Sequence, residues 1–128
     1  MSSAFGLRRV TEVFIASENL SAGNFINKWN DSGTAKARKA DATTEGKQAD
    51  GFVLVAVTIG NPVVVYSIGQ INNQLSGLTV GTVYYLSTTP GGVTITAPST
   101  PGNIVQKLGT TSSATEMVFD PYDPLVVT

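Results

Sequence analysis

Apolar residues run together, or alternate with polar ones, in short stretches along most of the chain. Val, Ile and Thr dominate these stretches, and helix-favouring runs of Leu, Glu, Lys and Ala are nearly absent. The pattern therefore predicts an all-β fold, a single compact barrel or sandwich of about nine short strands with extended terminal arms. The expected strands cover residues 10–16, 24–30, 34–40, 51–58, 62–68, 82–87, 93–96, 103–108 and 115–119.

Three turns punctuate this pattern. Residues 30–33, Asn-Asp-Ser-Gly, predict a hairpin because Asn and Asp bond their own backbone and Gly accepts a positive φ. Residues 90–92, Pro-Gly-Gly, predict a second reversal, between 82–87 and 93–96. The turn at 59–62 separates two runs that are apolar on both faces, and we expect these two runs to be the most buried.

The stretch 34–40 is ambiguous, because its Ala and Lys residues favour a helix. It follows a hairpin turn and is too short to form a stable helix alone. As a strand it would place Lys36 and Arg38 on one face, with Ala35 and Ala37 on the other. We therefore predict a strand, followed by an exposed polar loop at 41–50.

Composition restricts the chemistry. The chain has 128 residues, the size of one domain, and it contains neither Cys nor His. Disulfides, zinc clusters, thiol nucleophiles and histidine-based triads are excluded. A net charge of −1 argues against nucleic acid as a partner. No run of about 20 apolar residues and no secretory signal pattern is present, so we expect a soluble protein made in a cytoplasm, with no membrane partner.

Charge is unevenly distributed along the chain. Seven of the eight basic residues lie at or before Lys47, and residues 51–106 contain no charged side chain. Open sheets usually protect their edges with charges, so an uncharged β segment of this length needs another protection. Either the sheet closes on itself or another chain covers it, and the sequence leaves both alternatives open.

The sequence divides into an N-terminal arm (residues 1–9), a β domain (10–119) and an extended C-terminal segment (120–128). The C-terminal segment carries two prolines, which exclude a helix. It either frays or docks on the sheet edge or groove of a neighbouring subunit, and its apolar end favours docking. The candidate subunit-interface residues are Asp120, Tyr122, Leu125, Val126 and Val127.

Acidic residues offer little support for catalysis or metal binding. Glu116, Asp120 and Asp123 lie close in sequence, but such a group more often marks a solvated surface or an interface than a pair of glycosidase carboxylates. The other acids of interest lack the spacing of a calcium loop; they are Asp31, Asp41, Glu45 and Asp50. We predict no enzyme activity, no metal and no cofactor.

Aromatic residues could form a platform for a sugar or a receptor, but core packing is the favoured interpretation. Adjacent tyrosines on a strand point to opposite faces, so only one of Tyr84 and Tyr85 can line a given surface. The residues considered are Phe25, Trp29, Tyr66, Tyr84 and Tyr85.

Several phrases recur together in one protein family. They are ENLSAGNF at 18–25, RKADA at 38–42, ADGFV at 49–53, GLTVGTVYYLS at 77–87, PGGVT at 90–94, VQKLG at 105–109 and TEMVF at 115–119, running into Asp120-Pro121. Over about 100 residues the chain resembles a small β domain of tailed-phage structural proteins. Similar domains occur as capsid decoration (cement) proteins and as modules of head and tail fibres.

The resemblance implies a structural role in a virion, without an active site. No coiled coil or collagen-like shaft precedes the domain, which favours a decoration protein on the outer surface of the capsid over a fibre module. A head- or tail-fibre attachment module and a carbohydrate- or receptor-binding domain remain alternatives. The implied partners are the major capsid protein and further copies of the chain, most simply in a homotrimer. The candidate capsid contacts are Phe5, Leu7, Arg8 and Arg9, which combine apolar anchors with two cations.

Overall fold

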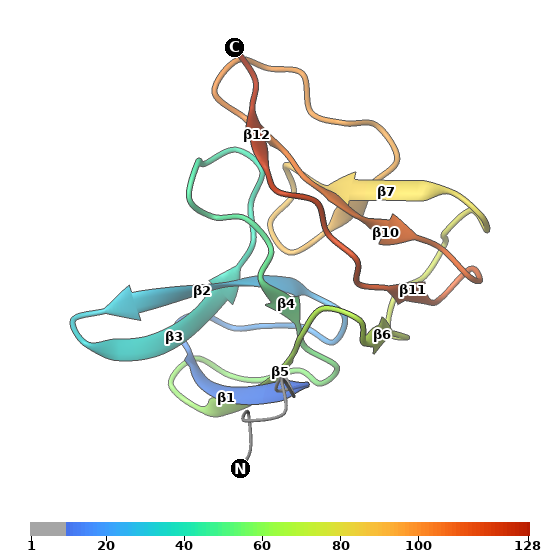
Figure 1. The fold of residues 1–128 in the computed structure, drawn as a ribbon. Helices are drawn as coiled ribbons and strands as arrows, with labels where there is room; N and C mark the ends of the chain where they lie inside the picture. Colours follow the sequence, from blue (N-terminus) through green and yellow to red (C-terminus); the bar gives the residue numbers. More distant parts are fainter. Residues whose placement is uncertain (1–9) are drawn as a thin grey trace, which may run out of the picture.

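The computed structural model describes residues 10–128, and these residues confirm the all-β prediction. They form twelve short strands and no helix (Figure 1). The strands are β1 (Thr11–Ala16), β2 (Phe25–Asp31), β3 (Thr34–Lys39), β4 (Gly51–Phe52), β5 (Pro62–Tyr66), β6 (Ile71–Asn72), β7 (Val83–Leu86), β8 (Val93–Thr94), β9 (Ile104–Val105), β10 (Lys107–Thr110), β11 (Met117–Val118) and β12 (Leu125–Val126).

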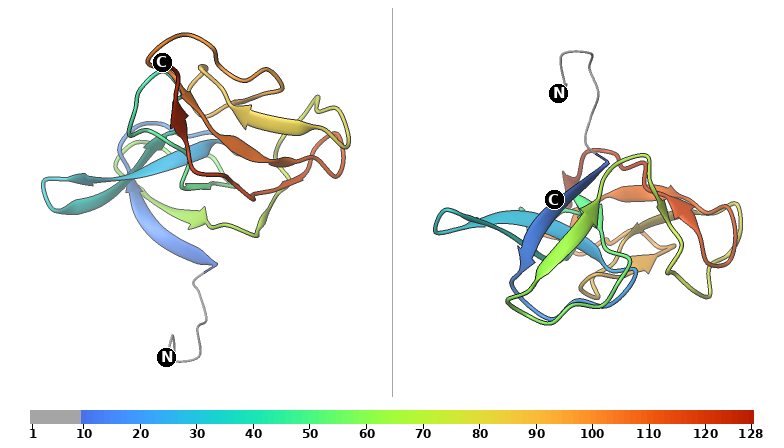
Figure 2. Two further views of the ribbon diagram at one scale, coloured as in Figure 1. Left: turned by 45° about the horizontal axis from the view of Figure 1, so that its top comes forward. Right: turned by 90° about the horizontal axis from the view of Figure 1, so that it is seen from below.

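The first half of the chain closes into a five-stranded barrel in the order β1-β3-β2-β4-β5. Strands β1 and β3 run parallel, and the other neighbours run antiparallel. The barrel closes where β1 pairs with β5, from Thr11 opposite Tyr66 to Ile15 opposite Pro62. These two strands lie side by side in the view from below (Figure 2, right).

The hairpin predicted at residues 30–33 joins β2 to β3. Ser32 and Gly33 have φ values of 53° and 93°, and the Gly33 N–H donates to Asn30 Oδ1 at 2.7 Å. Two successive positive φ values match the turn that twists a hairpin correctly. Strand β3 also confirms the strand prediction for 34–40: Ala37 is buried in the barrel, while Arg38 packs over the ring of Trp29.

Two hydrophobic cores share the wall formed by β2 and β4. Side chains alternate along a strand, so Ile26 and Val53 point into the barrel core, while Phe25 and Phe52 point into a second core outside it. Phe25 and Phe52 are directly opposite each other in the β2–β4 pair. The second core is completed by side chains from the later strands, among them Phe119.

The second half of the chain forms three small sheets that cover this outer core. They are the three-stranded sheet β10-β7-β8 and the pairs β11–β6 and β12–β9. The reversal predicted at residues 90–92 is confirmed, because Leu86 on β7 lies opposite Val93 on β8. Two strands, β6 and β12, lie in segments for which the sequence pattern predicted no strand.

The expectation for the two runs around the turn at 59–62 was partly wrong. The run 51–58 continues as a strand only through Phe52, and Val55 is 61% exposed. In β5, Val63 and Val65 are buried, but Val64 points outward with 39% exposure. The apolar residues of these runs are therefore buried only where their side chains point into one of the two cores, and elsewhere the same residue types lie on the surface.

Closure protects part of the charge-free stretch 51–106. Strands β4 and β5 are part of the wall of the closed barrel, so each has a neighbouring strand on both sides and neither forms a free edge. The remaining strands of the stretch are two to four residues long, and short strands offer little edge for unwanted pairing. Within the described residues, closure and short strands thus replace the charges that usually protect a sheet.

Candidate functional site

The C-terminal segment is docked on its own chain. The backbone N–H groups of Asp120 and Tyr122 donate to Leu108 and Lys107 carbonyls at 2.9 and 3.2 Å. Further along, Leu125 in β12 pairs with Val105 in β9. The segment therefore contacts its own molecule, and the predicted docking on a neighbouring subunit stays a prediction.

The side chains of this segment remain largely available. Tyr122 is 64% exposed, and its ring lies under the ammonium of Lys107, at 4.3 Å from the ring centroid. Leu125 and Val126 are 70% and 42% exposed, while Val127 is half-buried. A docked backbone with exposed apolar side chains is an ordered surface that a partner could cover. The candidate capsid contacts Phe5, Leu7, Arg8 and Arg9 lie outside the described residues.

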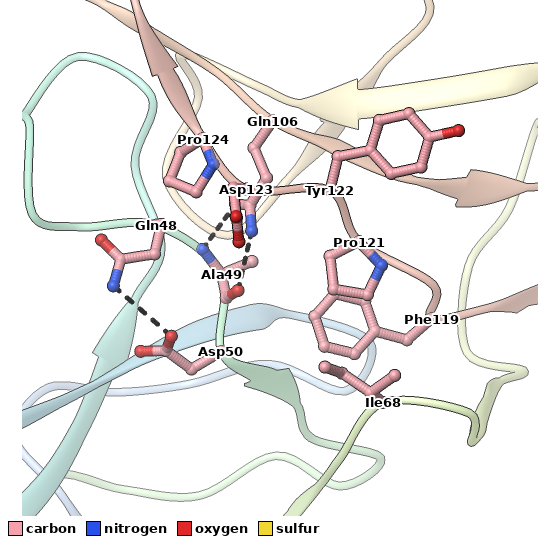
Figure 3. A pocket seen from close by; sticks show the side chains of 10 residues that line it. All are labelled: Gln48, Ala49, Asp50, Ile68, Gln106, Phe119, Pro121, Tyr122, Asp123 and Pro124. Carbon is pink, nitrogen blue, oxygen red and sulfur yellow. Dashed lines mark hydrogen bonds between the residues drawn. The ribbon is translucent and has the colours of Figure 1, made fainter.

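A cleft of about 400 Å³ lies beneath the C-terminal segment (Figure 3). One side carries the polar side chains of Gln48 and Asp50, which come from the loop before β4. The other side is apolar, and Ile68, Phe119 and Pro121 form it. The remaining lining residues are Ala49, Gln106, Tyr122, Asp123 and Pro124.

Gln106 fixes the back of the cleft. Its side-chain amide accepts a hydrogen bond from the Ala49 N–H at 2.8 Å and donates one to the Ala49 carbonyl at 3.0 Å (Figure 3). The side chain thereby pairs with the backbone as a neighbouring strand would. This pair of bonds joins the loop before β4 to the segment between β9 and β10. The two segments are therefore held in a fixed position relative to each other at the cleft.

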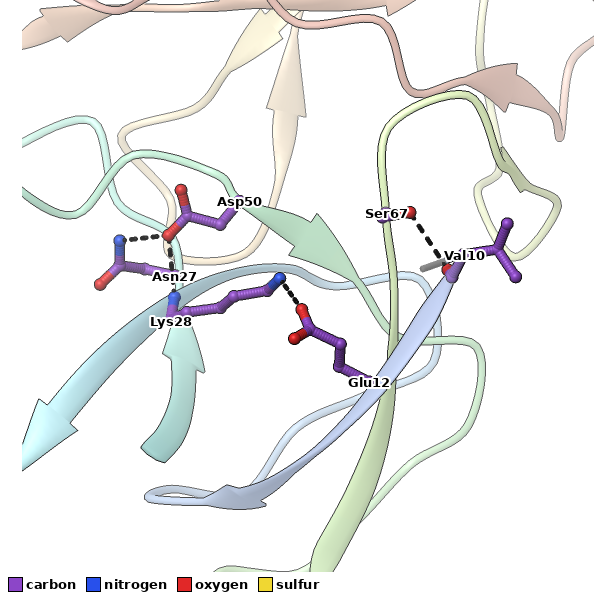
Figure 4. A network of polar contacts seen from close by, with 6 residues as sticks. All are labelled: Val10, Glu12, Asn27, Lys28, Asp50 and Ser67. Atoms are coloured by element: carbon purple, nitrogen blue, oxygen red, sulfur yellow. Dashed lines mark hydrogen bonds and ion pairs between the residues drawn. The ribbon is translucent and has the colours of Figure 1, made fainter. Parts of the chain in front are cut away.

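Asp50 is a partly buried carboxylate of the cleft. Its Oδ2 accepts hydrogen bonds from the Asn27 side chain at 3.0 Å and from the Lys28 N–H at 2.9 Å (Figure 4). Burial nevertheless raises the pKa of Asp50 above its ordinary value of 3.8, and these hydrogen bonds and the charge of Lys28 offset only part of that effect. The ammonium of Lys28 is itself ion-paired with Glu12 (Figure 4).

This raised pKa predicts a pH-dependent contribution to stability. The folded chain holds the Asp50 proton to higher pH than the unfolded chain does, so this group stabilises the fold below about pH 3.8, and the contribution is lost as pH rises through the folded pKa. The Asp50→Asn variant lacks this titration. Denaturant unfolding of both proteins between pH 3 and pH 7 should show wild-type stability, relative to the variant, declining with pH. A relative stability that increases with pH would contradict the assignment.

The acids considered for catalysis or metal binding do not converge. Among residues 10–128, no three acidic side chains are close enough to hold a metal ion. Asp31 is ion-paired with Lys36, and Asp41 accepts hydrogen bonds from Thr43 in its own turn. Asp123 lines the cleft, whereas Asp120 and Glu116 are not among its lining residues.

The aromatic residues mostly confirm the core interpretation. Phe25 and Tyr84 are buried, and Tyr66 stacks on Phe52 with centroids 5.6 Å apart. Trp29 is half-buried, its indole N–H donates to the Ser17 hydroxyl, and Arg38 covers one face of its ring. Trp29 also lines an open depression at the barrel end with Phe14, Lys28, Asn30, Gly33 and Ala35.

Comparisons with known proteins identify no relative. No protein-family model matches the chain, and a search of curated proteins finds no match. None of residues 10–128 belongs to a helix with the length and apolar character needed to span a membrane.

The cleft was not predicted from the sequence. Asp50 stood at the end of an expected polar loop, Ile68 at the end of an expected strand and Asp123 in the C-terminal segment. Their meeting depends on barrel closure and on the path of the C-terminal segment across Phe119. The one available signal was the pair of prolines around Tyr122 and Asp123, which indicated a rigid extended backbone.

Proposed function

We propose that this chain is a non-enzymatic structural protein of a phage virion, a decoration protein that binds the outer surface of an assembled capsid and stabilises it. The proposal rests on the family resemblance of its recurring phrases and on where those phrases lie in the fold. Its partner is the major capsid protein, and the protein is made in the host cytoplasm before it joins the virion.

One observation carries the proposal: phrases far apart in sequence bond directly to one another. The Phe25 N–H donates to the Gly91 carbonyl at 3.0 Å, the Gly91 N–H to the Ala40 carbonyl at 2.7 Å, and the Ala40 N–H to the Phe25 carbonyl at 3.0 Å. Three of the recurring phrases thus form a closed ring of backbone hydrogen bonds. The bonds between Ala49 and Gln106 join two more. The recurring segments therefore belong to one connected scaffold. This supports the interpretation that the resemblance to the family extends over the whole domain.

The physical task suits such a scaffold. A decoration protein needs a rigid body with exposed contact surfaces, and it gains affinity by repeating one weak contact through its own oligomer. The two-core body supplies rigidity, and the N-terminal arm and the exposed side chains of the C-terminal segment supply contacts in this proposal.

An apolar strip on the outside of the barrel is the proposed subunit contact. Val13 and Val64 lie opposite each other across the β1–β5 pair, with 67% and 39% exposure, and Ile15 and Pro62 form the next pair on the same face. Ile104, an apolar strand residue of the same charge-free stretch, is 1% exposed in its own core and is unavailable for this role.

Val64→Lys should therefore release monomers from the proposed homotrimer while the chain stays folded, because the change adds a charge to an exposed position. Sedimentation equilibrium gives the mass, and circular dichroism checks the fold. Val80→Lys, at an exposed turn position, is the matched control and should keep the wild-type mass. An unchanged mass for a folded Val64→Lys variant would rule out this strip as the contact.

Co-sedimentation with capsids tests the function. A chain lacking residues 1–9 should remain folded but bind capsids poorly, because the apolar anchors and two arginines of the arm are removed. Trp29→Ala should bind as the intact chain does, whereas a carbohydrate-binding module would keep its function without the arm and lose it with Trp29. Full capsid binding by the shortened chain would contradict the role of the arm, and no binding by the intact chain would contradict decoration.

A further inference from the structure

The cleft beneath the C-terminal segment has two chemically different walls. Ile68, which is 45% exposed, and the ring of Pro121 present apolar surface, and the buried ring of Phe119 closes the cleft behind them. On the other side lie Asp50 and Gln48, whose side chains are hydrogen-bonded to each other. A volume of about 400 Å³ is enough for one or two long side chains.

No cation lines this cleft within the described part of the chain. The nearby ammonium groups have other partners: Lys28 pairs with Glu12, and Lys107, which is not among the lining residues, lies over the ring of Tyr122. Asp123 makes no hydrogen bond or ion pair with a described residue, and Asp50 accepts only uncharged donors. Two carboxylates and no cation thus line the cleft, beside an apolar wall, and the charge of Lys28 reaches Asp50 from outside this lining.

We propose that the cleft receives an arginine side chain from an extended segment of the capsid protein, an inference that rests on the proposed function. The aliphatic stem of the arginine lies against Ile68 and Pro121, and its guanidinium lies between Asp50 and Asp123. An arginine carries both features on one side chain, and its planar group can donate to two carboxylates at once. The countercharge also removes part of the cost of keeping Asp50 ionised in a partly buried position.

The geometry favours a preformed site. Pro121 and Pro124 restrict the backbone on both sides of Asp123, and hydrogen bonds from Asp120 and Tyr122 hold the segment to β10. Little conformational entropy is then lost when a ligand enters.

Capped arginine tests the chemistry of the cleft without a capsid. Titration of N-acetyl-arginine amide into the ¹⁵N-labelled full chain should shift the amide signals of Ala49, Asp50 and Asp123 in a saturable way. N-acetyl-citrulline amide has the same shape without the charge and should give no saturable shift. Asp123→Asn and Asp50→Asn should each weaken arginine binding by about fivefold, as expected for loss of one partly exposed ion pair. Asp120→Asn removes the same charge from the same segment, outside the cleft, and should leave the affinity unchanged.

Three outcomes would overturn the proposal. Equal shifts with citrulline would show that charge is not recognised. Equal affinity of Asp123→Asn, Asp50→Asn and Asp120→Asn would show that binding occurs elsewhere or through net charge alone. Markedly tighter binding of capped arginine to a chain lacking residues 1–9 would show that the arm competes for the cleft. The cleft would then be assigned to the arginines of the chain's own arm.

Capsid binding separates failure of this inference from failure of the proposed function. If the intact chain co-sediments with capsids and Asp123→Asn does so equally well, the cleft is not the contact and decoration stands. If the intact chain does not bind capsids, decoration fails, and with it the assignment of the arginine to the capsid protein. The expected result is capsid binding by the intact chain and by Asp120→Asn, and at least fivefold weaker binding by Asp123→Asn.

Discussion

Replacing Phe25 with alanine should lower the free energy of unfolding by about 3–5 kcal/mol, a large part of the total stability of a domain this size. Phe25 is fully buried, and its ring lies 5.8 Å from Phe52 and 5.4 Å from Phe119, measured between centroids. Phe25 therefore packs the β2–β4 wall of the barrel against Phe119, the residue just before the C-terminal segment. Truncation leaves a cavity at this junction, because three different segments surround it and cannot all move inward.

Urea unfolding of Phe25→Ala measures this loss. Val80→Ala, with the side chain 61% exposed, is the control and should change stability by less than about 0.5 kcal/mol. The melting temperature of Phe25→Ala should fall by roughly 10–20 °C. A loss below about 1 kcal/mol would mean that the outer core is not packed around Phe25 as described.

Gly23→Ala should cost about 3 kcal/mol or more, because two independent penalties add. Gly23 has a φ of 88°, which disfavours any side chain, and an added Cβ would lie 2.5 Å from the carbonyl oxygen of Gln74. The two backbones cannot separate easily, since the Asn72 side chain donates to the Gly23 carbonyl at 3.0 Å and accepts from the Gln74 N–H at 3.1 Å.

Gly60→Ala separates the two penalties. Gly60 has a φ of 90°, but an added Cβ would meet no atom within 4 Å. Its cost should be limited to the conformational term, about 1–2 kcal/mol. Equal losses for Gly23→Ala and Gly60→Ala in thermal unfolding would show that the close approach to Gln74 does not constrain the fold.

Local signals in the sequence were sufficient for much of the fold. The hairpin at 30–33 and the reversal at 90–92 depend on residues that dictate their own backbone angles, and both are present. The length of β4 was overestimated, because Val55 belongs to the same residue class as the buried Val53 and only the end of the shared wall distinguishes them. Strand β12 was missed because its pairing with β9 is a contact across about twenty residues with no local pattern.

The candidate site was less accessible to sequence reasoning. The sequence singled out Tyr122 and Leu125 as candidate subunit-interface residues, a role that stays a prediction, and both side chains are exposed on the C-terminal segment. Asp50 was assigned to a solvated loop, whereas it is partly buried and bonded to Asn27 and Lys28 of the barrel wall. Burial of a polar residue by distant segments depends on tertiary topology, which residue periodicity does not encode.

Imaging of the capsids to which the proposed function assigns this chain, with and without the purified protein, tests that proposal most directly. The account predicts added density of this size at repeated positions on the outer surface wherever capsid subunits meet, and greater resistance of the decorated shells to disruption. Added density only at a single vertex or on the tail, or none at all, would contradict it.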